Sequence, residues 1–72
     1  MKIKLGQRYH YKSIKVDNRG FIGEVIKVLT DTEATLCVLQ DLGYGCGKDH
    51  IWPKENVGNA ERYVYLEGQD KG

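Results

Sequence analysis

The chain has 72 residues, with eleven basic and ten acidic side chains and a formal net charge of +1. A chain this short forms one domain and has too little interior for an enzyme-sized cleft, and its near-neutral charge argues against a composition dominated by nucleic-acid binding. Nine glycines against one proline predict short strands joined by tight turns. We expect a single domain over 1–72, with an ordered core over about 4–67 and a frayed tail at 68–72.

The charges are unevenly distributed along the chain. Residues 1–29 hold seven Lys or Arg and two acidic residues, whereas residues 30–72 hold four and eight. Strands distant in sequence can be neighbours in a small barrel, so these charges can cancel as cross-strand pairs. They can also form a basic face that binds a partner. The sequence leaves both readings open.

The first predicted strand covers residues 7–16. Its apolar residues change from odd to even positions near Ser13, which indicates a kink or bulge there. Residues 17–20 form a predicted turn in which Gly20 can take a positive φ. The next strand, 21–29, is rich in β-branched residues, and Gly23 within it indicates a bulge or bend.

A polar connection at 30–33 leads to a partner strand at 34–40, so that residues 20–40 read as a β-hairpin. We expect Leu36 and Val38 to face the core, with the opposite parity, Cys37 and Leu39, as the alternative.

The second half of the chain starts with a predicted loop at 41–49, whose three closely spaced glycines indicate a mobile connection. Residues 50–52 predict a short strand, and 53–56 a single helical turn that begins with proline. Residues 62–66 predict the closing strand. The fold predicted is all-β, a small five-stranded SH3-like barrel with one short helical turn before the last strand. A five-stranded OB-type barrel is the alternative, although it usually needs a longer chain.

The spacing of residues can be compared with the patterns that phosphate binding, metal binding and nucleophilic catalysis require. The glycine loop resembles a phosphate cradle, but its spacing matches neither the P-loop nor the dinucleotide pattern. The possible metal ligands include no C-x-x-C pair, and Cys37 reads as a buried strand residue. Cys46 lies near His50, but no helix N-terminus follows it to lower its pKa. We therefore expect no enzyme activity, no cofactor, no metal and no small-molecule substrate, and two reduced cysteines.

The aromatic residues give the strongest functional signal. Tyrosines occur in pairs in the first and last predicted strands, which lie side by side in SH3-like barrels, so the four rings can form one cluster. Such a cluster can be a peptide groove or a stacking platform for bases. It can also simply fill a small core. The binding residues predicted on this basis, with basic residues for charge steering, are Tyr9, Tyr11, Lys12, Lys15, Arg19, Tyr44, Trp52, Tyr63 and Tyr65.

Several segments carry a resemblance to a known group of proteins: 6–11 (GQRYHY), 20–25 (GFIGEV), 47–52 (GKDHIW) and 63–71 (YVYLEGQDK). Through them the stretch from about Lys4 to Asp70 resembles the small SH3-like barrel proteins of bacteriophage and prophage genomes. The resemblance implies a small barrel, a phage-like origin and no known chemistry. The segment 20–25 also looks like the glycine-bearing strand of KOW domains, which bind nucleic acid.

The function expected from these features is that of a non-catalytic binding module, a phage-encoded factor that docks on a host protein and alters its activity. The alternatives are nucleic-acid binding through the basic first strand and self-assembly through a free edge strand. The sequence has no apolar run of the length of a signal peptide or a membrane span. We expect a cytoplasmic protein that does not enter a membrane and exists as a monomer or small homo-oligomer.

Overall fold

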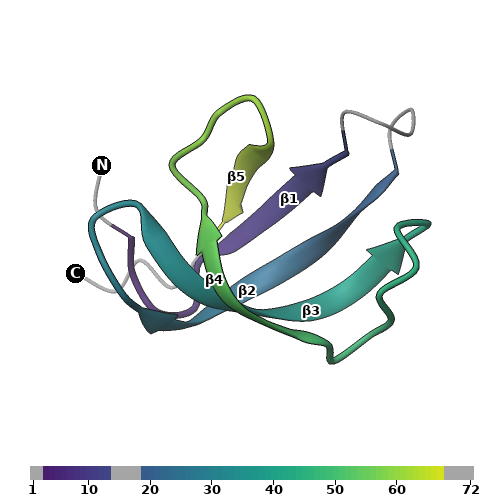
Figure 1. Cartoon of the computed structure of the whole chain (residues 1–72), viewed down its shortest axis with the longest axis horizontal. Coiled ribbons are helices and arrows are strands. Elements are labelled where there is room, and N and C mark those ends of the chain that lie inside the picture. Colours follow the sequence, from purple (N-terminus) through teal and green to yellow (C-terminus); the bar gives the residue numbers. More distant parts are fainter. Residues whose placement is uncertain (1–2, 14–18, 68–72) are drawn as a thin grey trace.

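The computed structural model describes residues 3–13 and 19–67 and gives them an all-β fold. The strands are β1 (Arg8–Lys12), β2 (Gly20–Val28), β3 (Glu33–Leu42), β4 (Ile51–Asn56) and β5 (Tyr63–Glu67). They form one antiparallel sheet in the order β4-β3-β2-β1-β5 (Figure 1). The prediction of a five-stranded all-β domain is confirmed.

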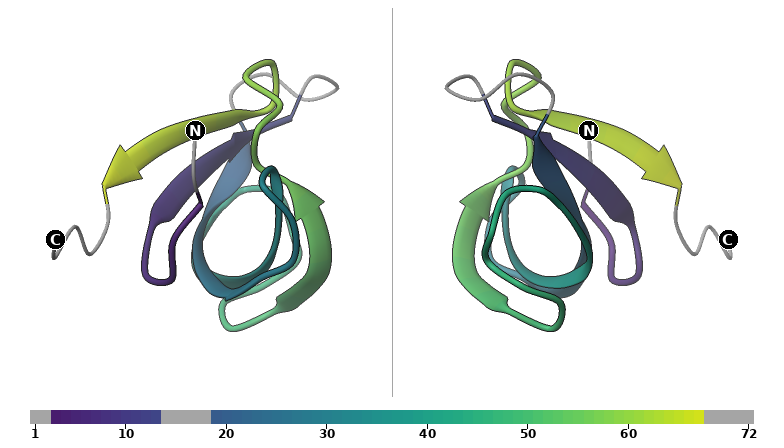
Figure 2. Two further views of the ribbon diagram at one scale, coloured as in Figure 1. Left: turned by 90° about the vertical axis from the view of Figure 1, so that its left-hand side faces the viewer. Right: turned by 90° about the vertical axis from the view of Figure 1, so that its right-hand side faces the viewer.

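The sheet curls strongly but does not close. Figure 2 shows β2, β3 and β4 wrapping around a common axis while β5 extends away from it. Among the described residues, β4 pairs only with β3 and β5 only with β1, which leaves β4 and β5 as the two edges of the sheet. We call the gap between these edges the seam.

β1 lies between β2 and β5, so the predicted pairing of the first and last strands is confirmed. Tyr9 is opposite Tyr65, and Tyr11 is opposite Tyr63. The four tyrosines therefore share the inner face of the sheet, because residues two apart in a strand point to the same side.

β2 and β3 form the predicted hairpin. The register shifts between Ile22 and Gly23, which confirms a bulge at this glycine. Leu36 and Val38 are fully buried, as expected. Cys37, which we expected to be buried, is only half-buried because it belongs to the opposite face of β3.

Gly20 corrects the turn prediction. It is the buried first residue of β2, pairs with Lys12 and does not have a positive φ. A Cβ atom at this position would overlap the Tyr11 carbonyl oxygen. Glycine is needed here because two backbones approach closely. The rest of the predicted turn, with Lys15 and the second part of the predicted first strand, lies outside the described residues.

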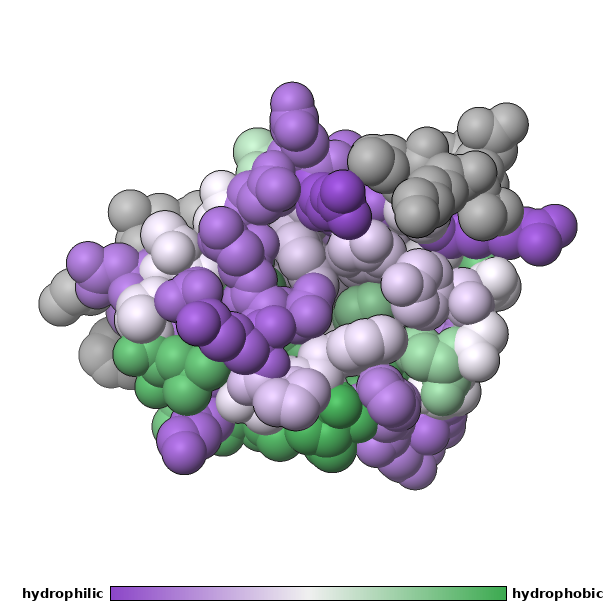
Figure 3. Space-filling model, viewed as in Figure 1, coloured by the Kyte–Doolittle hydropathy of each residue, from purple (hydrophilic) through white to green (hydrophobic). Residues whose placement is uncertain are grey.

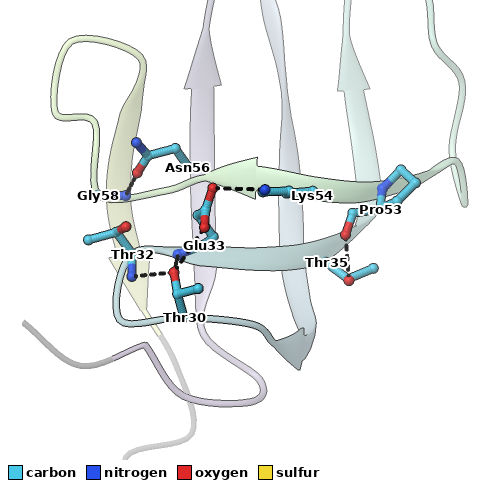
Figure 4. Close-up of polar contacts among 8 residues, drawn as sticks. All are labelled: Thr30, Thr32, Glu33, Thr35, Pro53, Lys54, Asn56 and Gly58. Atoms are coloured by element: carbon cyan, nitrogen blue, oxygen red, sulfur yellow. Dashed lines mark hydrogen bonds and ion pairs between the residues drawn. The ribbon is translucent and has the colours of Figure 1, made fainter.

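The helical turn predicted at 53–56 is wrong. These residues belong to β4, with Ala34 opposite Glu55 and Glu33 opposite Asn56. Figure 4 shows this strand along β3, with the Thr35 hydroxyl donating to the Pro53 carbonyl oxygen at 2.7 Å. Proline is tolerated because β4 is an edge strand, where a missing amide breaks no interior ladder.

The chain turns after β4 rather than within it. The carbonyl oxygen of Asn59 accepts hydrogen bonds from the amides of Arg62 and Tyr63, at 3.0 and 2.9 Å. Asn side chains favour such turns because they bond nearby backbone groups. This turn connects β4 to the start of β5 and therefore lies at one end of the seam.

Candidate binding site in the seam between β4 and β5

Three of the four paired tyrosines belong to the core. Tyr9, Tyr11 and Tyr63 are 1%, 9% and 5% exposed, whereas Tyr65 is 44% exposed. Tyr9 packs edge-on against both Tyr63 and Tyr65, with ring centroids 6.4 and 5.5 Å apart. The prediction that these tyrosines are accessible binding residues is therefore wrong for Tyr9, Tyr11 and Tyr63. For them the core-filling alternative holds, because a core this small is filled by large rings.

A second group of rings brings Tyr44 and Trp52 to the same end of the sheet. The Tyr44 ring contacts Tyr11 at a centroid distance of 5.3 Å and Trp52 at 6.1 Å, and it is 40% exposed. Trp52 is half-buried and stacks on Phe21, with centroids 5.8 Å apart. Tyr11 connects these rings to Tyr63, 5.1 Å away. The structure thus joins Tyr11, Tyr44, Trp52 and Tyr63, and only Tyr44 among them is largely accessible.

A polar cavity of about 280 Å³ opens beside this group, in the seam. The Tyr63 hydroxyl donates a hydrogen bond to the Glu55 carboxylate and so links the two sheet edges. Arg62 donates from Nη1 to the Tyr11 hydroxyl at 3.2 Å. The cavity is lined by Tyr11, Glu55, Asn56, Asn59, Arg62 and Tyr63. Figure 3 shows hydrophilic residues covering this side of the molecule, over β4 and the turn that follows.

The cavity carries one acidic and one basic side chain, Glu55 and Arg62, and the Tyr63 hydroxyl within it stays protonated. Burial raises the pKa of Tyr63 far above its ordinary value, and the hydrogen bond to Glu55 raises it further. Burial also raises the pKa of Tyr44, with a smaller effect from the neighbouring Tyr11. The site therefore combines the side chains of Glu55 and Arg62 with tyrosine hydroxyls, which can both accept and donate hydrogen bonds.

The two asparagines of the cavity are held by the turn. Asn56 Oδ1 accepts from the Gly58 amide at 3.1 Å, and Asn59 Oδ1 accepts from the Glu61 amide at 3.0 Å. Their carboxamide NH₂ groups are the donors that these side chains can still offer to a ligand.

The glycine loop beside Tyr44 has a definite hydrogen-bonded shape. Asp41 accepts from the amides of Gly43, Tyr44, Gly45 and Gly47, at 2.7 to 3.1 Å. The hydrogen bonds from Gly47 and Gly45 are the main cause of an Asp41 pKa below its ordinary value. The phosphate cradle was rejected from the sequence on spacing, and in the structure the loop amides are directed at the chain's own Asp41 carboxylate.

The predicted basic residues are only partly gathered. Lys12 is half-buried at the end of β1, and the Arg19 side chain lies along Gly43, where a Cβ would be 3.4 Å from its Cγ. Lys15 lies outside the described residues. The ion pairs found in the described ranges include Arg8 with Glu24, at 3.9 Å, and Lys54 with Glu33, at 3.6 Å. Both pairs join residues of the same half of the sequence, so they do not show cancellation between the two halves.

The cysteines and histidines form no metal site within residues 3–13 and 19–67, where no cluster of three or more possible ligands occurs. Cys37 and Cys46 are free thiols. Cys46 packs against the core beside Trp52, and this burial raises the pKa of its thiol. At neutral pH Cys46 is therefore protonated, which disfavours a nucleophilic role.

Sequence reasoning missed four residues of the cavity, namely Glu55, Asn56, Asn59 and Arg62. Because 53–56 was interpreted as a helical turn, the edge strand that carries Glu55 and Asn56 was not predicted. One signal could have identified them. A carboxylate, two asparagines and an arginine lie within eight residues of one another, directly before the predicted tyrosine pair of the closing strand.

Comparison with protein-family models, curated proteins and solved structures finds no match to this chain. Within its described residues the chain has no helix long and apolar enough to cross a membrane.

Proposed function

We propose that this chain is a non-catalytic binding module that recognises another protein through the seam between β4 and β5. The observation that carries this proposal is the cavity of about 280 Å³ between the two sheet edges, with the exposed Tyr44 ring beside it. Aromatic rings and arginines are the residues that most often carry the binding energy of protein interfaces.

The size of the cavity favours a protein partner over a small substrate. Sites for drug-sized ligands measure roughly 300 to 1,000 Å³, so this cavity lies just below the smallest of them. It is large enough for one inserted side chain. A polar, uncharged group such as a carboxamide would match Glu55 and Arg62 together, because it carries a donor and an acceptor side by side.

The resemblance noted in the sequence extends the proposal to biological context. A small SH3-like protein of phage origin would act in the host cytoplasm by docking on a host protein and altering its activity. The protonated state of Cys46 supports a function that depends on binding and not on covalent catalysis.

Capture from a bacterial lysate tests the proposal when four immobilised proteins are compared. The wild type and Leu5→Ala are expected to retain the same host protein, because Leu5 is 60% exposed, belongs to the segment before β1 and does not line the cavity. Glu55→Gln and Tyr44→Ala are expected to lose it. Equal capture by all four proteins would place the partner elsewhere and contradict the proposal.

One observation favours nucleic acid as a second candidate partner. The Arg19 side chain lies along the glycine loop next to the exposed Tyr44, which combines a positive charge with a stacking surface. Gel-shift titrations with single- and double-stranded DNA and RNA distinguish the two candidates. Nucleic-acid binding would weaken steeply with added salt and with Arg19→Ala, and absence of binding at low salt would exclude it.

A further inference from the structure

The loop that carries Tyr44 is rich in glycine. Residues 43–47 read GYGCG, and the three glycines have positive φ values of 92° to 100°. A glycine loses more conformational freedom than any other residue when the chain adopts one shape. A loop of this composition therefore needs a specific contact to hold a single shape.

The side chain of Asp41, one residue before the end of β3, supplies that contact through both of its oxygens. Oδ1 accepts from the amides of Gly43, Tyr44 and Gly45, at 2.8 to 3.1 Å. Oδ2 accepts from the amides of Gly45 and Gly47, at 3.0 and 2.7 Å. Aspartate suits this role because its short side chain reaches the backbone amides that follow it in a turn. One carboxylate thus fixes the backbone on both sides of Tyr44.

Packing holds the Tyr44 ring only in part. The ring makes edge-on contacts with Tyr11, Phe21 and Trp52, with centroids 5.3, 5.6 and 6.1 Å apart, and it remains 40% exposed. The direction in which this ring points therefore depends on where the loop backbone places its Cα atom.

The base of the loop is attached to the sheet independently of the Asp41 side chain. The backbone of Asp41 is opposite Phe21, and Gly43 forms a bridge with Gly20. Cys46 packs against the core. Loss of the Asp41 carboxylate is therefore expected to release the middle of the loop, with Tyr44, and to leave the sheet intact.

We propose that Asp41 is the positioning residue of the seam site, where it holds the Tyr44 ring against Tyr11 and Trp52 before a partner arrives. This inference rests on the proposed function, in which Tyr44 contacts the partner. The Asp41 carboxylate is directed at its own loop amides and acts through Tyr44. A loop that is already ordered raises affinity, because no ordering is required at the moment of binding. A loop that held this shape about one tenth of the time would bind about tenfold more weakly.

The single tryptophan of the chain provides a readout that needs no partner. Trp52 contacts the Tyr44 ring, so quenching of its fluorescence by acrylamide reports whether that ring stays in place. Asp41→Ala is expected to be quenched more steeply than the wild type, with a slope approaching that of Tyr44→Ala. Asp41→Asn keeps one of the two acceptor oxygens, so its slope is expected to lie between those of the wild type and Asp41→Ala.

Thr30→Ala is the matched control, because Thr30 holds a different turn in the same way. Its Oγ1 accepts from the amides of Thr32 and Glu33, at 3.3 and 3.0 Å, between β2 and β3 (Figure 4). Thr30→Ala is expected to be quenched like the wild type. The double variant of Asp41→Ala and Tyr44→Ala is expected to match Tyr44→Ala alone, because Asp41 acts through that ring. All variants are expected to keep the circular dichroism spectrum of the wild type.

Quenching that is equal in Asp41→Ala and the wild type would overturn the inference. So would a double variant that is quenched more steeply than Tyr44→Ala, because Asp41 would then act on Trp52 by another route.

Affinity for the host protein that the wild type retains from a bacterial lysate separates this inference from the proposed function. Asp41→Ala is expected to bind that protein about tenfold more weakly than the wild type, and Thr30→Ala equally well. Binding that is lost in Tyr44→Ala but unchanged in Asp41→Ala would overturn the inference alone. Binding that is unchanged in Tyr44→Ala would overturn the proposed function itself.

Discussion

At the scale of single residues, the glycines of this chain serve two different physical needs. Gly20 is required because the backbone of β1 passes too close for a Cβ atom. Gly43, Gly45 and Gly47 are required because they have positive φ values of 92° to 100°. Composition alone does not separate these cases, since both appear in the sequence as glycines near predicted turns.

Close backbone approach and positive φ predict different losses of stability when the glycine is replaced by alanine. Gly20→Ala is expected to destabilise the fold by about 3 kcal/mol or more, because the β1–β2 ladder must separate to admit the methyl group. Gly45→Ala is expected to cost roughly 1 to 2 kcal/mol from backbone strain alone, since nothing beyond its chain neighbours lies within 4 Å of its Cβ position. Urea unfolding of both variants checks the order, and an equal or reversed order would contradict this reading of Gly20.

Asp41 predicts a pH dependence of stability. Its folded-state pKa lies below the ordinary value of 3.8, so its contribution to stability is present above that value and is lost as the pH falls through the lower folded pKa. Asp41→Ala is therefore expected to be less stable than the wild type at neutral pH, with the difference shrinking in acid. Urea unfolding from pH 7 down to pH 2 measures this. A difference independent of pH would show that the four amide hydrogen bonds do not stabilise the charged form.

At the scale of elements, sequence patterns located all five strands but misread β4. The alternation in β3 favoured Leu36 and Val38 as core residues over the opposite parity, Cys37 and Leu39, and the structure buries Leu36 and Val38. In β4 a proline followed by polar residues also fits the start of a helix. The decisive factor is pairing with β3 at Ala34 and Glu33, a contact between residues about twenty positions apart that local propensity does not contain.

The hydrogen bond between Tyr63 and Glu55 links the two edges that backbone pairing leaves apart. Tyr63→Phe is expected to lower the free energy of unfolding by about 1.5 kcal/mol, the usual cost for a hydrogen bond to a charged group. Tyr65→Phe, at an exposed ring, is expected to change it by less than about 0.5 kcal/mol. Thermal or urea unfolding measures both variants, and equal effects would argue against a bridge across the seam.

At the scale of the whole molecule, the tyrosine-rich core predicts loss of stability in alkali. Burial raises the pKa values of Tyr9, Tyr44 and Tyr63 above the ordinary value of 10.0, because the folded state disfavours the phenolate. Their contribution to stability is fully present below pH 10 and is lost as the pH rises beyond it. Unfolding experiments from pH 8 to 12 should show this decline, and a smaller one in Tyr63→Phe. An identical decline in both proteins would assign it to other groups.

Some features of the candidate site could be predicted from the sequence, whereas others depend on the assembled sheet. The pairing of the first and last strands followed from the fold class, and with it the meeting of Tyr11 and Tyr63. Which rings remain accessible depends on how far the sheet curls, so burial of Tyr9, Tyr11 and Tyr63 was not readable from their alternation. The seam itself arises from the missing pairing of β4 with β5, a property of the assembled sheet.

We propose that this protein acts by binding a partner at the seam. Hydrogen–deuterium exchange of the protein alone and in complex with its captured partner tests this claim most directly. We expect slower exchange in the complex at Tyr44 and across residues 55–63, while the hairpin turn at 29–32 is unchanged. Protection confined to that turn or to the free edge of β5, with none at the seam, would contradict binding at the seam.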